Sequence, residues 1–200
     1  MRHLCTCVAV VAVMGLGAAA AQAQLVSNLP GTGSGSGTNL GLGTDLTDRT
    51  KAVGVTIGAT AFDFASVVAL ISNGSPASTL SGGIYSDVGG NPGTLLAAFT
   101  PVAIADSQAV GEVSITTAAP YVLAAGTTYW FVLDGPAISN SLLWQSLSPN
   151  VAPTSGSGAT YVGYRFSSNG GASWASSSTF NGVTVNADLV PVELQRFTVE

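Results

Sequence analysis

Hydrophobic and polar residues alternate with a period of two over many short stretches of this chain. In the clearest stretch, Val53, Val55 and Ile57 are separated by Gly54 and Thr56. This pattern is typical of a β-strand with one buried face. Comparable short runs occupy residues 24–30, 62–70, 82–87, 95–99, 113–115, 142–145, 161–166, 180–185 and 194–199.

One run differs from the others because it is apolar without interruption. Residues 129–133 read Tyr-Trp-Phe-Val-Leu and are followed by Asp134 and Gly135, which are typical of a turn. A strand that is apolar at every position is covered on both faces. The sequence therefore predicts a central strand here.

The spacing of these runs predicts an all-β fold. Gly, Pro and Asn separate the runs, and no stretch shows a helical period. We expect one domain over residues 24–200, an antiparallel β-sandwich of jelly-roll type. Residues 31–43 are rich in Gly, Ser and Thr and are predicted to form a flexible loop.

The first 23 residues have the features of a signal peptide. Arg2 and His3 precede an apolar run over residues 8–16, and Ala21 and Ala23 form an A-x-A cleavage site. The apolar run is too short to span a membrane. We expect cleavage after Ala23, export from the cytoplasm, and a mature chain without a transmembrane segment.

Composition excludes several classes of function. Charged residues make up only 8% of the chain, and Lys51 is the only lysine, which argues against nucleic-acid binding. Both cysteines and the only histidine lie in the predicted signal peptide. The mature chain would therefore lack the groups for a nucleophilic triad or a His/Cys zinc site, and we expect no enzymatic activity.

Carboxylates leave two further possibilities open. Two of them alone can hydrolyse a glycosidic bond, but Asp87 and Asp134 lie in predicted turns, so an acid-only glycosidase is the least favoured alternative. Calcium, which binds to oxygen ligands, is conceivable at residues 45–48 and at Asp87 with Asn91. Neither segment matches a calcium-loop motif, and plain turns are favoured, so no cofactor is predicted.

Aromatic residues suggest a binding surface. Exposed aromatic rings beside amide or hydroxyl groups can hold a sugar by stacking and hydrogen bonds. Trp144, Gln145, Tyr161 and Tyr164 are the candidates. They support a carbohydrate-binding module as the alternative function, although large aromatic residues also fill sandwich cores.

Residues 167–174 (SSNGGASW) resemble the Asp-box of β-propellers, with Asn169 and Ser173 in place of the usual aspartate and threonine. Such a box is a hairpin element in which a polar side chain ties the turn and the tryptophan packs beneath it. A propeller would need repeats along the chain, and there are none. We therefore expect a single tied hairpin at Trp174.

Two longer segments resemble a known family. Residues 83–97 (GIYSDVGGNPGTLLA) and 123–133 (LAAGTTYWFVL) are similar to segments of choice-of-anchor R domain proteins, which are exported bacterial proteins. The resemblance implies a surface domain joined to varying C-terminal sorting signals, and it implies no catalytic activity. The end of this sequence departs from the family, since no Pro-Glu-Pro tail precedes Glu200.

Taken with the signal peptide, the resemblance predicts a non-enzymatic structural or interaction domain at the cell surface or in the extracellular matrix. Its expected partners are extracellular polysaccharides or surface proteins. The missing tail leaves release, or non-covalent retention at the surface, as the expected outcomes.

Overall fold

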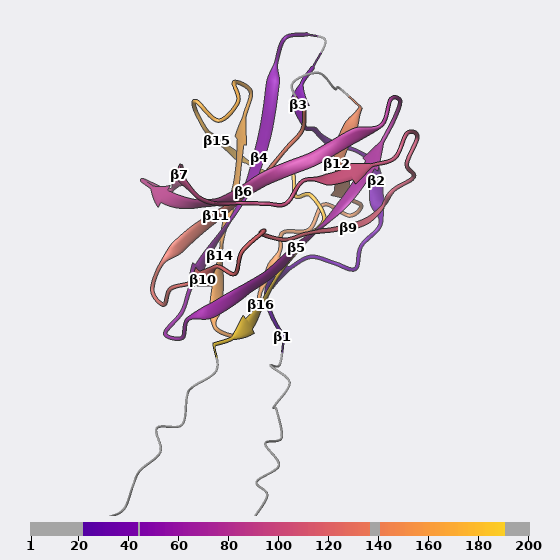
Figure 1. Ribbon diagram of the computed structural model, residues 1–200. Coiled ribbons are helices and arrows are strands. Elements are labelled where there is room, and N and C mark those ends of the chain that lie inside the picture. Colours follow the sequence, from indigo (N-terminus) through magenta and orange to yellow (C-terminus); the bar gives the residue numbers. More distant parts are fainter. Residues whose placement is uncertain (1–21, 44, 137–140, 191–200) are drawn as a thin grey trace, which may run out of the picture.

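The computed structural model describes residues 22–43, 45–136 and 141–190, which form two sheets packed face to face (Figure 1). The first sheet has the order β13 (Thr154–Ser155), β1 (Gln22–Ser27), β16 (Val183–Leu189), β5 (Phe62–Asn73), β12 (Leu142–Leu147) and β2 (Gly33–Asn39). β9 (Gly111–Ile115) and β10 (Val122–Leu123) also pair with β5.

The second sheet has the order β15 (Ala175–Ser177), β14 (Ala159–Ser167), β4 (Asp48–Ile57), β11 (Thr128–Asp134), β6 (Ser78–Val88) and β7 (Asn91–Ala98). β3 (Gly41–Leu42) pairs with β4, and β8 (Val102–Ile104) pairs with β6. Each pairing between these named strands is antiparallel. The predicted all-β antiparallel sandwich is confirmed, and its jelly-roll order stays a prediction.

β11 is buried on both faces, as the unbroken apolar run predicted. Tyr129, Phe131 and Leu133 point into the main core between the sheets. Trp130 and Val132 point the other way and form a second, smaller cluster on the outer face of the second sheet. The five residues are at most 4% exposed, so the prediction of a covered central strand is confirmed.

The predicted flexible loop over residues 31–43 is wrong, because this segment forms β2 and β3. β2 is an edge strand whose backbone pairs with β12, in a register that sets Thr38 opposite Trp144 and Gly37 opposite Gln145. A Cβ atom on Gly37 would lie 2.1 Å from the carbonyl oxygen of Trp144. The glycine that suggested a loop instead permits a close approach between two strands.

Two predictions fall outside the described residues. Most of the signal peptide, including the apolar run at 8–16, lies there, and so does the predicted strand at 194–199. Across the described ranges, the structure contains no helix that could span a membrane.

Candidate functional site

The two segments that resemble the exported family meet in space. Residues 83–97 contribute most of the β6–β7 hairpin, and residues 123–133 lead from β10 into β11. The indole Nε1 of Trp130 donates a hydrogen bond of 2.7 Å to Oδ1 of Asp87 and so joins them. Asp87 also ties its own turn, since Oδ2 accepts a hydrogen bond from the backbone N–H of Gly90. The predicted turn role of Asp87 is confirmed. Its hydrogen bond to Trp130 was not predicted from the sequence.

Arg165 of β14 contacts both the turn of this hairpin and the Trp130 ring. Its guanidinium lies 5.2 Å from the centre of the Trp130 ring, within the range of a cation–π contact. Its Nε donates to the carbonyl oxygen of Gly90 at 2.8 Å and to Oδ1 of Asn91 at 2.9 Å. The turn of the β6–β7 hairpin is therefore anchored to β14 across the sheet.

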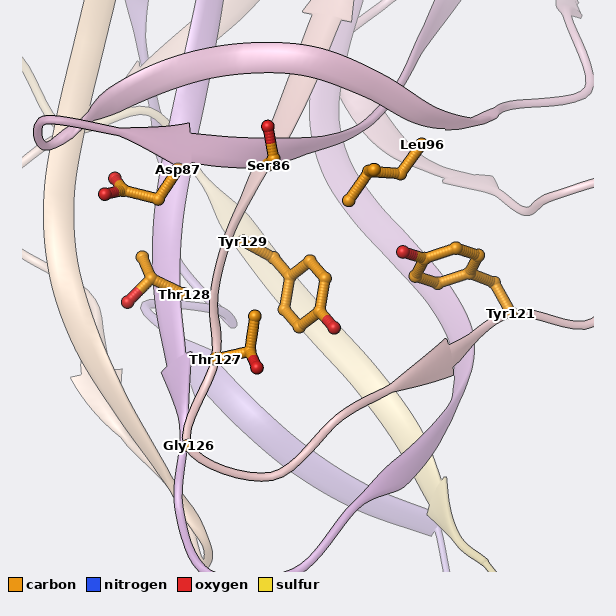
Figure 2. Close-up of a pocket in the computed structure, with 8 residues that line it drawn as sticks. All are labelled: Ser86, Asp87, Leu96, Tyr121, Gly126, Thr127, Thr128 and Tyr129. Atoms are coloured by element: carbon orange, nitrogen blue, oxygen red, sulfur yellow. The ribbon is translucent and has the colours of Figure 1, made fainter.

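A groove opens between this hairpin and the β10–β11 connection (Figure 2). We call it the edge groove; its volume is about 420 Å³, within the range of roughly 300–1,000 Å³ that ligand pockets usually have. It is lined by Ser86, Asp87, Leu96, Tyr121, Gly126, Thr127, Thr128 and Tyr129. Seven of these eight residues belong to the two family-like segments.

The walls of the edge groove combine hydroxyl groups with apolar surface. Figure 2 shows the Tyr121 ring facing Leu96 and Tyr129 across the opening. The rings of Tyr121 and Tyr129 meet edge to face with centroids 6.1 Å apart. Burial, and to a lesser extent Tyr129, raises the pKa of the Tyr121 phenol, which therefore stays protonated at neutral pH. Thr127 adds a second hydroxyl, which bonds weakly to a backbone carbonyl at 3.3 Å.

The structure places the predicted sugar-binding residues inside the molecule. Trp144 exposes 0% of its surface and donates from Nε1 to the carbonyl oxygen of Gly182. Tyr164 is equally enclosed, and its ring lies 5.7 Å from that of Trp144. Gln145 is buried, while Tyr161 is partly buried and packs against Tyr164. Trp144, Tyr161 and Tyr164 come together in the core, whereas Gln145 lies on the other face of β12, where Nε2 donates a hydrogen bond to Oγ of Ser72. The prediction of an exposed aromatic surface here is therefore wrong.

Lys51 lies beside this buried aromatic cluster. It points inward from β4, and Nζ donates to Oγ1 of Thr38 at 3.2 Å and to the carbonyl oxygen of Thr179 at 2.8 Å. Nζ also lies 5.2 Å from the centre of the Tyr164 ring. Burial lowers the pKa of Lys51 to about 7. A small space of about 230 Å³ adjoins it.

A second hollow lies on the opposite, outer face of the second sheet. We call it the outer cavity; it holds about 100 Å³ and is lined by Thr50, Tyr85, Gly93, Val132, Asp134, Gly170, Gly171 and Trp174. Asp134 closes the end of β11, where Oδ1 accepts a hydrogen bond from the backbone N–H of Gly135. Its predicted turn role is therefore confirmed.

The environment of Asp134 disfavours a negative charge. Burial raises the pKa of its carboxyl to about 6. The hydrogen bond from Gly135 opposes this shift, and the nearby carboxylate of Asp48 reinforces it. Burial and the charge of Asp134 also raise the pKa of Tyr85. The sequence marked Asp134 only as a turn residue, because the approach of Asp48 depends on strand pairing.

The hairpin that resembles an Asp-box forms one wall of the outer cavity. Oδ1 of Asn169 accepts hydrogen bonds from the hydroxyl of Ser167 at 2.9 Å and from the backbone N–H of Ser173 at 2.9 Å. Gly171 has a positive φ of 85°, and a Cβ added there would lie 3.4 Å from the Trp174 ring. The prediction of a polar tie with a packed tryptophan is confirmed.

The two segments that were conceivable for calcium have other uses. Asp45 forms a bidentate pair with Arg49, and this hydrogen-bonded pair lowers the pKa of Asp45 to about 2. Oδ1 of Asn91 accepts a hydrogen bond from Nε of Arg165. Asp45 and Asn91 therefore have partners within the protein.

Comparison with family models, with curated proteins and with solved structures finds no match to this chain. The functional argument therefore depends on the edge groove and the outer cavity.

Proposed function

We propose that this protein is an exported, non-enzymatic interaction domain of the cell surface or extracellular matrix, and that its edge groove binds a polysaccharide chain. The observation that carries the proposal is the groove itself, whose walls join hydroxyl groups to the face of Tyr121. A sugar presents apolar C–H faces and many hydroxyls, which match such a surface. The aromatic contact is thus assigned to Tyr121 instead of Trp144.

The low charge of the chain supports an uncharged ligand. Only 8% of the residues are charged, and the groove contains one carboxylate, Asp87, whose oxygens already accept hydrogen bonds from Trp130 and Gly90. Binding by hydroxyls and aromatic surface depends little on ionic strength. We therefore expect retention on a neutral glycan to be similar at low and at moderate salt.

The test is affinity electrophoresis through neutral and acidic polysaccharides, with the chain from Gln24 and its Tyr121→Ala variant. We expect retention on at least one glycan to fall about tenfold or more in the variant, because a stacking residue at the centre of a site carries much of the binding energy. Tyr161→Ala is the matched control, because Tyr161 is also a partly buried tyrosine packed against the main core, but lies outside the groove.

Equal retention of the wild type and Tyr121→Ala would contradict the assignment to the edge groove. If no glycan retains the wild type, the polysaccharide proposal is wrong, and the groove becomes a candidate surface for a protein partner. Export is tested separately by mass spectrometry of secreted protein, in which we expect the first residue to be Gln24.

A further inference from the structure

We propose that the outer cavity is a binding site for a divalent cation of the calcium type, held by the carboxylates of Asp134 and Asp48 and the hydroxyl of Thr50. The site is separate from the edge groove and lies between β4, β6, β11 and the β14–β15 turn. Its two carboxylates come from different strands, Asp48 from the start of β4 and Asp134 from the end of β11.

The hydroxyl of Thr50 is the first observation that points to a ligand. Thr50 is 3% exposed, lines the cavity, and its Oγ1 has no hydrogen-bond partner. A buried hydroxyl without a partner costs about 1–3 kcal/mol, and native proteins rarely leave one unexplained. A cation in the cavity would take a lone pair of this oxygen as a ligand.

The carboxylates are the second observation. The carboxylate of Asp48 lies against Gly170, whose backbone lines the cavity, since a Cβ on Gly170 would come within 2.5 Å of Oδ2. In the pairing of β11 with β4, Leu133 lies opposite Lys51, which places Asp134 next to Thr50 and two residues along β4 from Asp48. Arg49, the nearest basic residue in sequence, pairs with Asp45.

The size of the cavity selects the occupant. About 100 Å³ is well below the roughly 300 Å³ at which small-molecule pockets begin, so a sugar ring does not fit in the cavity. It suffices for one ion with a few water molecules. The carboxylate pair therefore suits a small cation better than the glycosidase considered from the sequence.

The donor set favours calcium over other metals. All three ligands are hard oxygens, which suit calcium, and no His or Cys lines the cavity. Among the described residues, no three His, Cys, Asp or Glu side chains are placed to hold a metal ion together. The proposed site has two carboxylates, so water must complete the coordination. Such a site is expected to be weak, with a Kd of about 10⁻⁴ to 10⁻³ M, as in extracellular modules.

Trp174 makes the site directly observable. Tb³⁺ has ligand preferences similar to those of Ca²⁺ and emits when a nearby indole is excited, and the Trp174 ring is part of the cavity wall. We expect terbium emission that saturates with the chain from Gln24 and is displaced by Ca²⁺. Asp134→Asn should weaken the apparent affinity for Ca²⁺ by about tenfold or more, because it removes a charged ligand.

Asp106→Asn is the matched control, because it removes the same charge in an exposed segment where Asp106 bonds to Ser75 and Ser107. A change of less than about twofold is expected there. Thr50→Val keeps the shape of the side chain and removes the ligand oxygen, so it should weaken Ca²⁺ binding while the protein stays folded.

Thermal unfolding provides a second readout that does not depend on terbium. Millimolar Ca²⁺ should raise the Tm of the wild type and leave that of Asp134→Asn unchanged, because a ligand stabilises the state that binds it. The proposal is overturned if Ca²⁺ neither displaces terbium nor raises the Tm. It is also overturned if Asp134→Asn and Asp106→Asn respond to Ca²⁺ alike.

Discussion

Thr50 and Lys51 are neighbours on β4, but their side chains lie on opposite faces of the second sheet and in opposite chemical situations. On the inner face, the cation of Lys51 is surrounded by Thr38, the carbonyl oxygen of Thr179 and the Tyr164 ring. On the outer face, the Thr50 hydroxyl has no hydrogen-bond partner. Burial raises the pKa of the nearby Asp134 carboxyl to about 6.

The difference shows how a polar group belonging to the fold is distinguished from one available to a ligand. On the inner face, the protein itself supplies the partners of Lys51. On the outer face, the protein leaves the buried Thr50 hydroxyl without a partner, so an ion can complete it. The inner site is therefore assigned to stability and the outer site to binding, and four predictions test this division.

The largest effect is expected from tryptophan replacement on the two faces. Trp144→Ala removes a fully buried ring and should lower the free energy of unfolding by about 3–5 kcal/mol. Trp174→Ala removes a partly exposed ring and should cost about 1–2 kcal/mol. Urea denaturation measures both values. Equal losses would show that the outer cluster is as much a part of the fold as the core.

The next effect concerns Lys51 and pH. The pKa of Lys51 is about 7 in the fold and 10.5 in the unfolded chain, so between these values only the unfolded chain binds the proton. The free energy of unfolding should therefore rise as the pH increases from about 7 to 10.5, by on the order of 4 kcal/mol. Lys51→Met should abolish this rise. If the variant keeps the same slope, another group is responsible.

Asp134 should show the opposite pH dependence. Its pKa is 3.8 in the unfolded chain and about 6 in the fold, so the folded protein holds a proton that the unfolded chain has lost. Stability should fall as the pH rises from about 4 to 6, by about 1–2 kcal/mol after allowance for the exposed part of the side chain. Asp134→Asn should remove that fall in calcium-free buffer. A pH profile identical to that of the wild type would contradict the shift.

The smallest effect compares one substitution at two threonines. Thr38→Val leaves Nζ of Lys51 without its hydroxyl partner and should destabilise the protein by about 1–2 kcal/mol. Thr50→Val removes a hydroxyl that bonds to nothing and should be neutral or stabilising by about 1 kcal/mol in calcium-free buffer. Chemical denaturation of both variants checks this, and a larger loss at Thr50 would reverse the assignment of the two faces.

Where hydrophobic pattern decided the structure, the sequence was a good guide. The covered strand at Trp130 is predicted by its unbroken run of apolar residues. The tied hairpin at Trp174 is predicted by adjacent residues because its hydrogen bonds join residues close in sequence. Trp144 is a candidate for either the surface or the core, because one aromatic ring in a short run suits either face of a strand. Only the pairing of β12 with β5 and β2 places it inside.

The two polar sites could not be predicted, for a different reason. Residues 48–51 (DRTK) resemble the polar end of a loop, yet β4 begins at Asp48 and carries these side chains into the sheet. Lys51 meets Thr179 from a distant part of the chain, and Asp48 approaches Asp134 only because β4 and β11 are neighbours. The β2 strand was missed because backbone pairing at a sheet edge needs no apolar side chains.

The pairing of the first described strand with the last has a mechanical consequence. β1 and β16 are antiparallel, with Gln22 opposite Asp188, so the two ends of the described chain leave the sandwich side by side (Figure 1). Tension between these ends would break the hydrogen bonds between β1 and β16 one after another, starting at the pair of Gln22 and Asp188. We therefore expect a low rupture force in single-molecule pulling from these ends, whereas attachment through one end alone would leave the ladder unloaded.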